Sequence, residues 1–267
     1  MIKTYLTKAA AALALALASA CTLAAGGGGT IYTLQTEVTD RATLQTGAQV
    51  YFNYCAGCHS LQYMRYSQLG ADLGLTEDQV MENLNFTGAK YTDYIIAAMP
   101  VGDAELGTGG TGWFTKAPPD LSLVGRSRGA DWIYSYLMTF YPDPSRPLGW
   151  NNVQFPNASM PNPLWQMQGI QNAEFHAKKK DAAGKELPCH ALEINGQCFV
   201  KLEPAVGGRM SAQEYKDSMR ALTTFLDYVG EPAALKRDQY GVWVLLYLIL
   251  LAGVTYLLKH EYWKDVH

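Results

Sequence analysis

The sequence predicts a mainly α-helical domain with long loops and a small β-hairpin, followed by one C-terminal transmembrane helix. Apolar residues recur at helical spacing over 41–55 and 212–230. An Asn-Gly pair at 195–196 is typical of a two-residue hairpin turn. The apolar run 239–258 has 20 residues and no charge, which is the length that a helix needs to cross a bilayer.

The N-terminus has the pattern of a secretory leader. Two lysines precede the apolar run 9–18, and small residues at 18–20 offer a cleavage site. This order is typical of a signal peptide, so we expect residues 1–25 to be removed from the mature chain. A lipoprotein leader, cleaved before Cys21, is less favoured because Ala18 stands where a larger aliphatic residue is usual.

The leader also decides the expected topology. Basic residues flank both ends of the run 239–258, so the positive-inside rule does not orient this helix. An exported chain would leave residues 26–238 outside the cytoplasmic membrane and keep the tail 259–267 in the cytoplasm. The sequence therefore predicts a single-pass protein of the bacterial inner membrane, with its main domain on the periplasmic side.

The charge balance restricts the partners. The chain has 24 acidic and 21 basic residues, for a net charge of −3. Loss of Lys3 and Lys8 with the leader would leave 19 basic residues and a net charge near −5. Such a chain does not favour nucleic acid as a ligand, and it favours a basic protein partner.

The chemistry centres on the pentapeptide Cys55-Ala56-Gly57-Cys58-His59. A C-x-x-C-H pattern is typical of covalent attachment of one c-type haem. Cys55 and Cys58 would each form a thioether to the porphyrin, and His59 would ligate the iron. A zinc site would need a second Cys/His pair at similar spacing, and a thioredoxin-like dithiol would need a flanking βαβ pattern. The sequence favours neither alternative.

The sixth ligand of the iron decides the class of haem protein. A methionine ligand gives an electron carrier, whereas an open position would favour a peroxidase or a gas sensor. Met99 and Met160 each precede a proline at the start of a loop, where a thioether can be aimed at the iron. Met160 is modestly favoured because it lies in the proline-rich segment 141–163, which we expect to wrap around the domain. His176 and His190 are weaker candidates.

Several further elements are expected. Gly47 lies on or near the apolar face of the first amphipathic helix and would let another helix cross closely. The second begins with a capping box, Ser211 with Glu214, and ends at Gly230, before Pro232. The other expected elements are short helices over 76–83 and 91–99, a glycine-rich loop over 102–113, and an aromatic helix over 131–141.

Two cysteines remain in the main domain, Cys189 and Cys198, and an oxidising compartment favours a disulfide between them. The hairpin disfavours it, because the Asn-Gly turn places Cys198 opposite Glu193 and leaves Cys189 opposite Leu202. Their Cα atoms would then lie more than about 7 Å apart. Either the strand bends near Pro188 and the bond forms, or both thiols stay free.

A series of motifs, taken together and in order, resembles the bacterial cytochrome c1 family. Members of this family are the haem subunit of ubiquinol–cytochrome c reductase, the cytochrome bc1 complex. The motifs are CAGCHSL (55–61), YMRY (63–66), APPDLS (117–122) with Arg126 and Arg128, GWNN (149–152), MP (160–161), YVGEP (228–232) and KHEYWKD (259–265).

The resemblance implies a cytochrome c-type haem domain in which the two amphipathic helices cross. Cys55 and Cys58 would carry one haem c, with His59 as the proximal and Met160 as the distal ligand. Arg126 matches an arginine that pairs with a haem propionate, a role that suits the fork geometry of a guanidinium.

The resemblance also implies a place in the respiratory chain. A Rieske iron–sulfur protein would deliver one electron to the haem, and a cytochrome c would accept it. The cytochrome b subunit and membrane lipid would be further contacts, within a dimeric complex. The chain would act as an electron carrier and catalyse no bond chemistry alone. The alternative is an independent membrane-tethered c-type cytochrome, or the haem subunit of another respiratory oxidoreductase.

Overall fold

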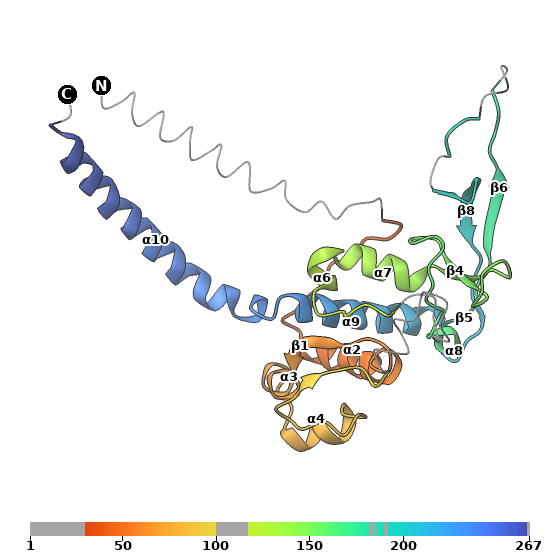
Figure 1. Cartoon of the computed structure of the whole chain (residues 1–267), viewed down its shortest axis with the longest axis horizontal. Helices are drawn as coiled ribbons and strands as arrows, with labels where there is room; N and C mark the ends of the chain where they lie inside the picture. Colours follow the sequence, from red (N-terminus) through yellow and green to blue (C-terminus); the bar gives the residue numbers. More distant parts are fainter. Residues whose placement is uncertain (1–29, 100–116, 182–183, 185, 190–191, 266–267) are drawn as a thin grey trace.

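The structure is a computed structural model that describes residues 30–99, 117–181, 184, 186–189 and 192–265. The predicted signal peptide and the predicted loop 102–113 lie outside these residues. Helix α9 runs through the middle of the main domain, with α2 on one side and α7 on the other (Figure 1). A long C-terminal helix, α10, extends away from this domain (Figure 1).

Helices α2 (Arg41–Tyr54) and α9 (Ala212–Gly230) cross, as the family resemblance implies. The crossing depends on Gly47, since a Cβ atom there would lie 2.1 Å from the backbone oxygen of Ala221 and 2.6 Å from Cβ of Phe225. The ring of Tyr51 packs against Phe225, and both side chains are fully buried. This interface forms the centre of the hydrophobic core.

Local capping sets where these helices begin. The Asp40 side chain accepts a hydrogen bond from the backbone amide of Ala42 at the start of α2. Ser211 and Glu214 form the predicted capping box, in which each side chain accepts from the other residue's backbone amide. Helix α9 ends at Gly230, as predicted.

A second group of elements follows α2: β1 (Leu61–Arg65), α3 (Tyr66–Leu73), α4 (Glu77–Asn83) and β2 (Tyr94–Ile95). Helix α4 confirms the prediction over 76–83. The predicted helix over 91–99 is wrong, because β2 pairs antiparallel with β1. Backbone amides of this segment bond to distant partners instead of to the preceding turn: Ala97 N donates to Ser60 Oγ (2.8 Å) and Met99 N to Gly57 O (3.1 Å).

The third group covers α9 on its other side. It contains α6 (Val124–Ser127), α7 (Ala130–Met138), β3 (Phe140–Pro142), β4 (Trp150–Asn152) and α8 (Trp165–Gln168). The aromatic helix ends at Met138, earlier than predicted, because Phe140 and Tyr141 pair with β4. Residues 153–163, all of them described, contain no helix or strand, as the prolines predict.

The remaining strands are β5 (Gly169–Ile170), β6 (Ala173–Ala177), β7 (Glu193–Ile194), β8 (Gln197–Leu202) and β9 (Val206–Gly207). The predicted hairpin is β7–β8, with Asn195 and Gly196 both at positive φ, 51° and 80°. Strand β6, which the sequence analysis missed, pairs with the other side of β8, and the resulting sheet projects from the domain (Figure 1).

Cys189 and Cys198 form a disulfide, with Cα atoms 5.3 Å apart. The predicted register is right, since Glu193 lies opposite Cys198. Strand β7 begins only at Glu193, so Cys189 lies outside the ladder and is not held opposite Leu202. Leu202 pairs instead with Ala173 of β6.

Helix α10 (Ala234–Trp263) contains the predicted membrane anchor. Among the described residues, one stretch is long and apolar enough to cross a membrane, Gln239–Trp263, and none of it is buried in the protein. Glu231 lies between α9 and α10 and accepts hydrogen bonds from Arg126 of α6 and Arg237 of α10. This three-residue cluster connects the main domain to the anchor.

Candidate functional site

The C-x-x-C-H motif forms a tight turn where α2 ends. Cys55 is the C-cap of the helix and donates its backbone amide to Tyr51 O (2.8 Å). Cys58 N and His59 N then both donate to Cys55 O, at 3.0 and 2.8 Å. The helix therefore sets the position of the first cysteine, and the turn sets the other two side chains relative to it.

Two hydrogen bonds hold His59, one at its ring and one at its backbone. Its ring Nδ1 lies 2.7 Å from the carbonyl oxygen of Pro119, and only 8% of the residue is exposed. Because a carbonyl can only accept, Nδ1 carries the proton, and Nε2 has the lone pair that a metal ligand needs. The hydroxyl of Tyr51 donates to the backbone oxygen of His59 at 2.6 Å and fixes the backbone of the motif.

Burial also sets the protonation of the motif. Burial lowers the pKa of His59, although the bond to Pro119 acts in the opposite direction, so the ring is neutral at neutral pH. Burial raises the pKa of the Cys55 thiol to about 12 and also raises the pKa of the Cys58 thiol. Thiols with a raised pKa do not suit a dithiol redox centre, which needs a thiolate. No group of three His, Cys, Asp or Glu side chains in the described part of the chain could hold a metal ion.

The segment after Pro118 is fastened along the motif. Leu121 N donates to Ser60 O at 2.9 Å. The Asp120 carboxylate accepts from the backbone amide of Gln62, and also from Ser122 N within its own turn. The Pro119 carbonyl was not predicted as the partner of His59. The only sequence signal was the Pro118-Pro119 pair, whose residues lack an amide hydrogen and can only accept.

Met160 lies half-buried in the irregular segment 153–163. Met99, its competitor, has its backbone bonded to Gly57 inside the haem motif, which places it beside the attachment turn. Met64 is 2% exposed and belongs to the hydrophobic core, and His176 is an exposed residue of β6. His190 lies outside the described residues. The assignment of Met160 as the sixth ligand, modestly favoured over Met99 by the sequence, stays a prediction.

The structure places Arg126 at the junction with the membrane helix. Its guanidinium forms an ion pair with Glu231 at 2.8 Å, and 63% of the side chain is exposed. Arg128 lies two residues further on, with its guanidinium over the ring of Trp132 at 4.8 Å. A role for Arg126 toward a haem propionate stays a prediction.

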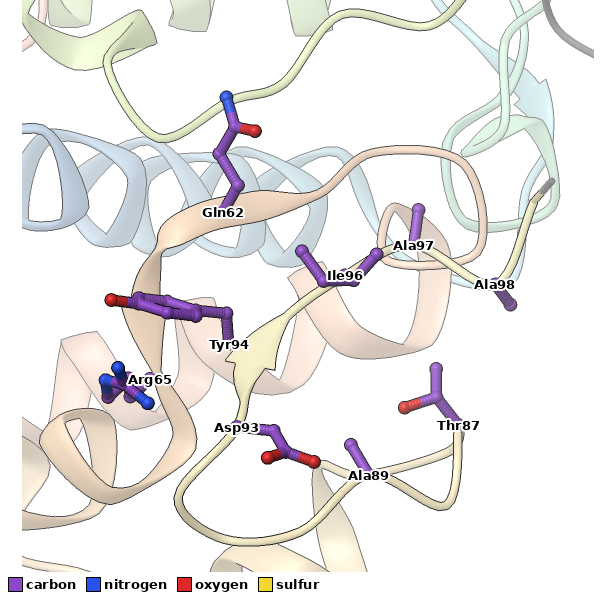
Figure 2. Close-up of a pocket in the computed structure, with 9 residues that line it drawn as sticks. All are labelled: Gln62, Arg65, Thr87, Ala89, Asp93, Tyr94, Ile96, Ala97 and Ala98. Atoms are coloured by element: carbon purple, nitrogen blue, oxygen red, sulfur yellow. The ribbon is translucent and has the colours of Figure 1, made fainter. Parts of the chain in front are cut away.

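An open pocket lies next to the motif but does not include it. Figure 2 shows Tyr94, Ile96, Ala97 and Ala98 along one wall, with Thr87 and Ala89 on the neighbouring loop and Arg65 on β1. The guanidinium of Arg65 stacks on the ring of Tyr94, 3.9 Å from its centroid. None of the predicted haem-binding residues lines this pocket, so it is separate from the candidate site.

Comparison with known proteins gives the family. A family model described as "Cytochrome C1 family" matches residues 33–183. Cytochrome c1 of Allochromatium vinosum is 45% identical over 246 residues, which cover 92% of this chain and 93% of that protein. The chain belongs to the cytochrome c1 family. The resemblance carried by the individual motifs is thereby confirmed.

Two other relatives carry different names. The ammonia monooxygenase gamma subunit of Nitrosomonas europaea is 39% identical over 85% of this chain and 85% of its own length. Cytochrome b/c1 of Bradyrhizobium diazoefficiens is 25% identical over 85% of this chain and 34% of its own length. The shared region in each case includes most of this cytochrome c1 chain.

Family membership establishes the broad function. A cytochrome c1 is the haem subunit of a cytochrome bc1 complex, with covalently bound haem c and with cytochrome b as a fellow subunit. The predictions of family, mainly α fold and electron-transport role are confirmed on this ground. The apolar helix in α10 fits a single-pass protein of the inner membrane.

Proposed function

We propose that this chain accepts one electron at a time from a Rieske iron–sulfur protein and passes it to a cytochrome c. The haem is attached through Cys55 and Cys58, and its iron is ligated by His59 and Met160. The main domain faces the periplasm. When bound, the haem supplies reversible one-electron chemistry, and the chain's own residues bind it, orient it and exclude water from it.

The observation that carries this proposal is the state of the His59 ring. A buried, neutral imidazole with Nδ1 donated to Pro119 O has one free lone pair, on Nε2. A hydrogen bond of this kind to a ligating histidine fixes its tautomer and ring orientation and raises its basicity. Electron transfer benefits because a ligand that does not reorient between the two iron states adds little to the barrier.

The two thiols complete the attachment site. Both are free, and Cys55 is buried beside the end of α2. Two thioethers from one short turn would tie the porphyrin to the most regular part of the fold. A haem fixed in this way needs no large enclosing pocket to remain bound, so one edge can stay accessible to a redox partner.

The acidic balance of the chain supports cytochrome c as the acceptor. With the leader removed the net charge would be near −5, and long-range attraction favours a basic partner. Rieske and cytochrome c would dock in turn, within a dimeric complex that cytochrome b and α10 hold in the membrane.

Optical spectroscopy of the purified holoprotein tests the ligand set. A methionine–iron bond gives a long-wavelength charge-transfer band in the oxidised protein. We expect this band in the wild type and in Met99→Leu, and its loss in Met160→Leu. Survival of the band in Met160→Leu together with its loss in Met99→Leu would move the ligand to Met99. Absence of the band in wild type, with ready binding of carbon monoxide, would instead favour an open sixth site.

A pair of arginine variants tests the propionate prediction. A positively charged guanidinium beside a propionate stabilises the reduced haem relative to the oxidised haem. Arg126→Gln removes this charge, so it should lower the midpoint potential in a redox titration. Arg128→Gln, two positions away, is the matched control. If only Arg128→Gln lowers the potential, the propionate partner is Arg128 and the Arg126 assignment is wrong.

Purification of the intact complex tests the place of the chain. A C-terminally tagged chain, solubilised in mild detergent, should bring with it a cytochrome b spectrum and the Rieske electron-paramagnetic signal. The Nitrosomonas relative is named as a subunit of ammonia monooxygenase. Recovery of a monooxygenase in place of cytochrome b would therefore favour a haem subunit of another oxidoreductase.

A further inference from the structure

The segment that carries Met160 is irregular but firmly held. Residues 153–163 are all described and form neither helix nor strand. Among the buried asparagines, Asn151 before this segment and Asn162 near its end each bond to its backbone or to neighbouring groups. Neither residue has a place in the proposed ligand set, so their burial needs another explanation.

Asn151 fixes the chain upstream of Met160. Its side chain is fully buried, and its Oδ1 accepts from the backbone amides of Asn157 (2.7 Å) and Asn152 (2.8 Å). Its Nδ2 donates to the Asp143 carboxylate at 2.8 Å. Asn157 has φ of +64°, a left-handed conformation that residues other than glycine rarely adopt. The bond that Asn157 N donates to Asn151 helps to hold this turn, together with the bond from the Arg146 guanidinium to Asn157 O at 2.9 Å.

Asn162 fixes the chain downstream. It is 3% exposed, and its Oδ1 accepts from Leu164 N at 2.9 Å. Its Nδ2 donates to Oε1 of Gln168, which is itself buried at the end of α8. Met160 thus lies three residues after one fixed backbone position and two residues before another.

We propose that Asn151 and Asn162 are positioning residues that keep the Met160 loop in the conformation in which its thioether reaches the haem iron. This inference rests on the proposed function, in which Met160 is the sixth ligand. A thioether is a weak ligand, so the apparent strength of its bond falls in proportion to the fraction of time that the loop spends in the competent conformation. Two buried amides that fix the backbone raise that fraction without touching the iron.

Competition with imidazole reports the fraction of time that the Met160 loop spends in the conformation that ligates the iron. Imidazole binds the iron only when Met160 leaves, so its apparent affinity reports how firmly the loop holds the ligand. In the oxidised, full-length holoprotein we expect Asn151→Ala and Asn162→Ala each to raise the imidazole affinity about tenfold, the change that loss of one buried hydrogen-bonding group gives. Met160→Leu sets the upper limit, since it has no thioether to displace.

Two controls separate positioning from general destabilisation. Asn172 is an exposed asparagine whose Nδ2 donates to the Glu203 carboxylate at 3.2 Å. Asn172→Ala should keep the wild-type imidazole affinity. Asn162→Asp keeps an oxygen that can accept from Leu164 N, so its imidazole affinity should lie between those of wild type and Asn162→Ala. This variant also tests the proposal if Asn151→Ala does not fold.

The outcomes are distinct. Suppose that Met160→Leu binds imidazole more tightly than wild type but both alanine variants keep the wild-type affinity. That result would overturn the positioning role, whether or not the melting temperature of the alanine variants falls. Wild-type affinity in Met160→Leu itself would overturn the proposed ligand, and this inference with it.

Discussion

The two sides of the proposed haem site are built in different ways. On the His59 side, the motif follows directly from the end of a long helix, α2, and the ligand ring is fixed by a backbone carbonyl. On the Met160 side, the chain has no regular structure, and buried asparagine side chains take the place of a helix or strand. An irregular loop can thus be held as specifically as a helix end, provided that buried amides satisfy its backbone groups.

Because the two sides are built differently, substitutions on them should affect different properties of the protein. The His59 side shares its packing with the α2–α9 crossing, so a defect there reaches the whole domain. The Met160 side depends on a few bonds between side chains and backbone, so a defect there should change ligation before it changes folding. Variants on the two sides of the site test that separation.

The largest effect should follow loss of the attachment thiols. Cys55→Ser with Cys58→Ser should abolish covalent haem completely, because no thioether can form. Haem staining after denaturing electrophoresis measures this. The matched control is Cys189→Ser, which removes a cysteine that forms the disulfide with Cys198. Retention of haem stain in the double variant would show that another residue attaches the cofactor.

The next largest effect should come from the helix crossing beneath the motif. Gly47→Ala would place a methyl group 2.1 Å from the backbone oxygen of Ala221, and backbone atoms cannot move aside as a side chain can. We expect the free energy of unfolding to fall by about 3 kcal/mol or more, measured by chemical denaturation. At Gly57, inside the motif, an added Cβ meets nothing within 4 Å, so Gly57→Ala should leave stability nearly unchanged. Equal stability of the two variants would contradict the close crossing.

A smaller effect should follow loss of a single hydrogen bond on the His59 side, where packing is kept. Tyr51→Phe keeps the ring in the core and removes the hydroxyl that donates to His59 O. The loss should cost about 1 kcal/mol of unfolding free energy, because the carbonyl oxygen loses its buried partner. Tyr54→Phe, at an exposed position of the same helix, is the control. A larger loss in Tyr54→Phe would contradict the role given to the Tyr51 hydroxyl.

The same contrast explains what the sequence could predict. The helices α2 and α9 were readable because their stripes and the Ser211 capping box are local patterns. The place of the C-x-x-C-H turn at the end of α2 was readable because the apolar stripe over 41–55 runs directly into it, whereas haem attachment at this turn stays a prediction. The hairpin register was also right, since an Asn-Gly turn fixes which residues face each other.

Features that depend on distant partners were not readable. The segment 91–99 was predicted as a helix, yet its amides bond to Ser60 and Gly57, and no spacing within the segment signals those bonds. The disulfide was left open because it depends on where β7 begins, which helix and strand propensities do not fix to the residue. The roles of Pro119 and Asn151 depend on contacts made across the fold.

The smallest effect concerns the junction between the main domain and the anchor, a third region that neither side of the site includes. The hydrogen bond from Arg237, aided by the nearby charge of Arg126, lowers the pKa of Glu231 below its usual value of 4.5. A lowered pKa means that the ionised carboxylate stabilises the folded protein. This contribution is complete above the usual pKa and is lost as the pH falls through the lowered one.

Because the Glu231 cluster is exposed, its contribution should stay below about 1 kcal/mol. Thermal unfolding of the detergent-solubilised full chain, at neutral pH and in acid, measures it. Glu231→Gln should lower the melting temperature slightly at neutral pH and leave it unchanged, relative to wild type, in acid. Arg126→Gln should give the same pattern in weaker form, since Arg237 would remain. A loss that persists in acid would mean that Glu231 acts through packing at the junction and that its charge is unimportant.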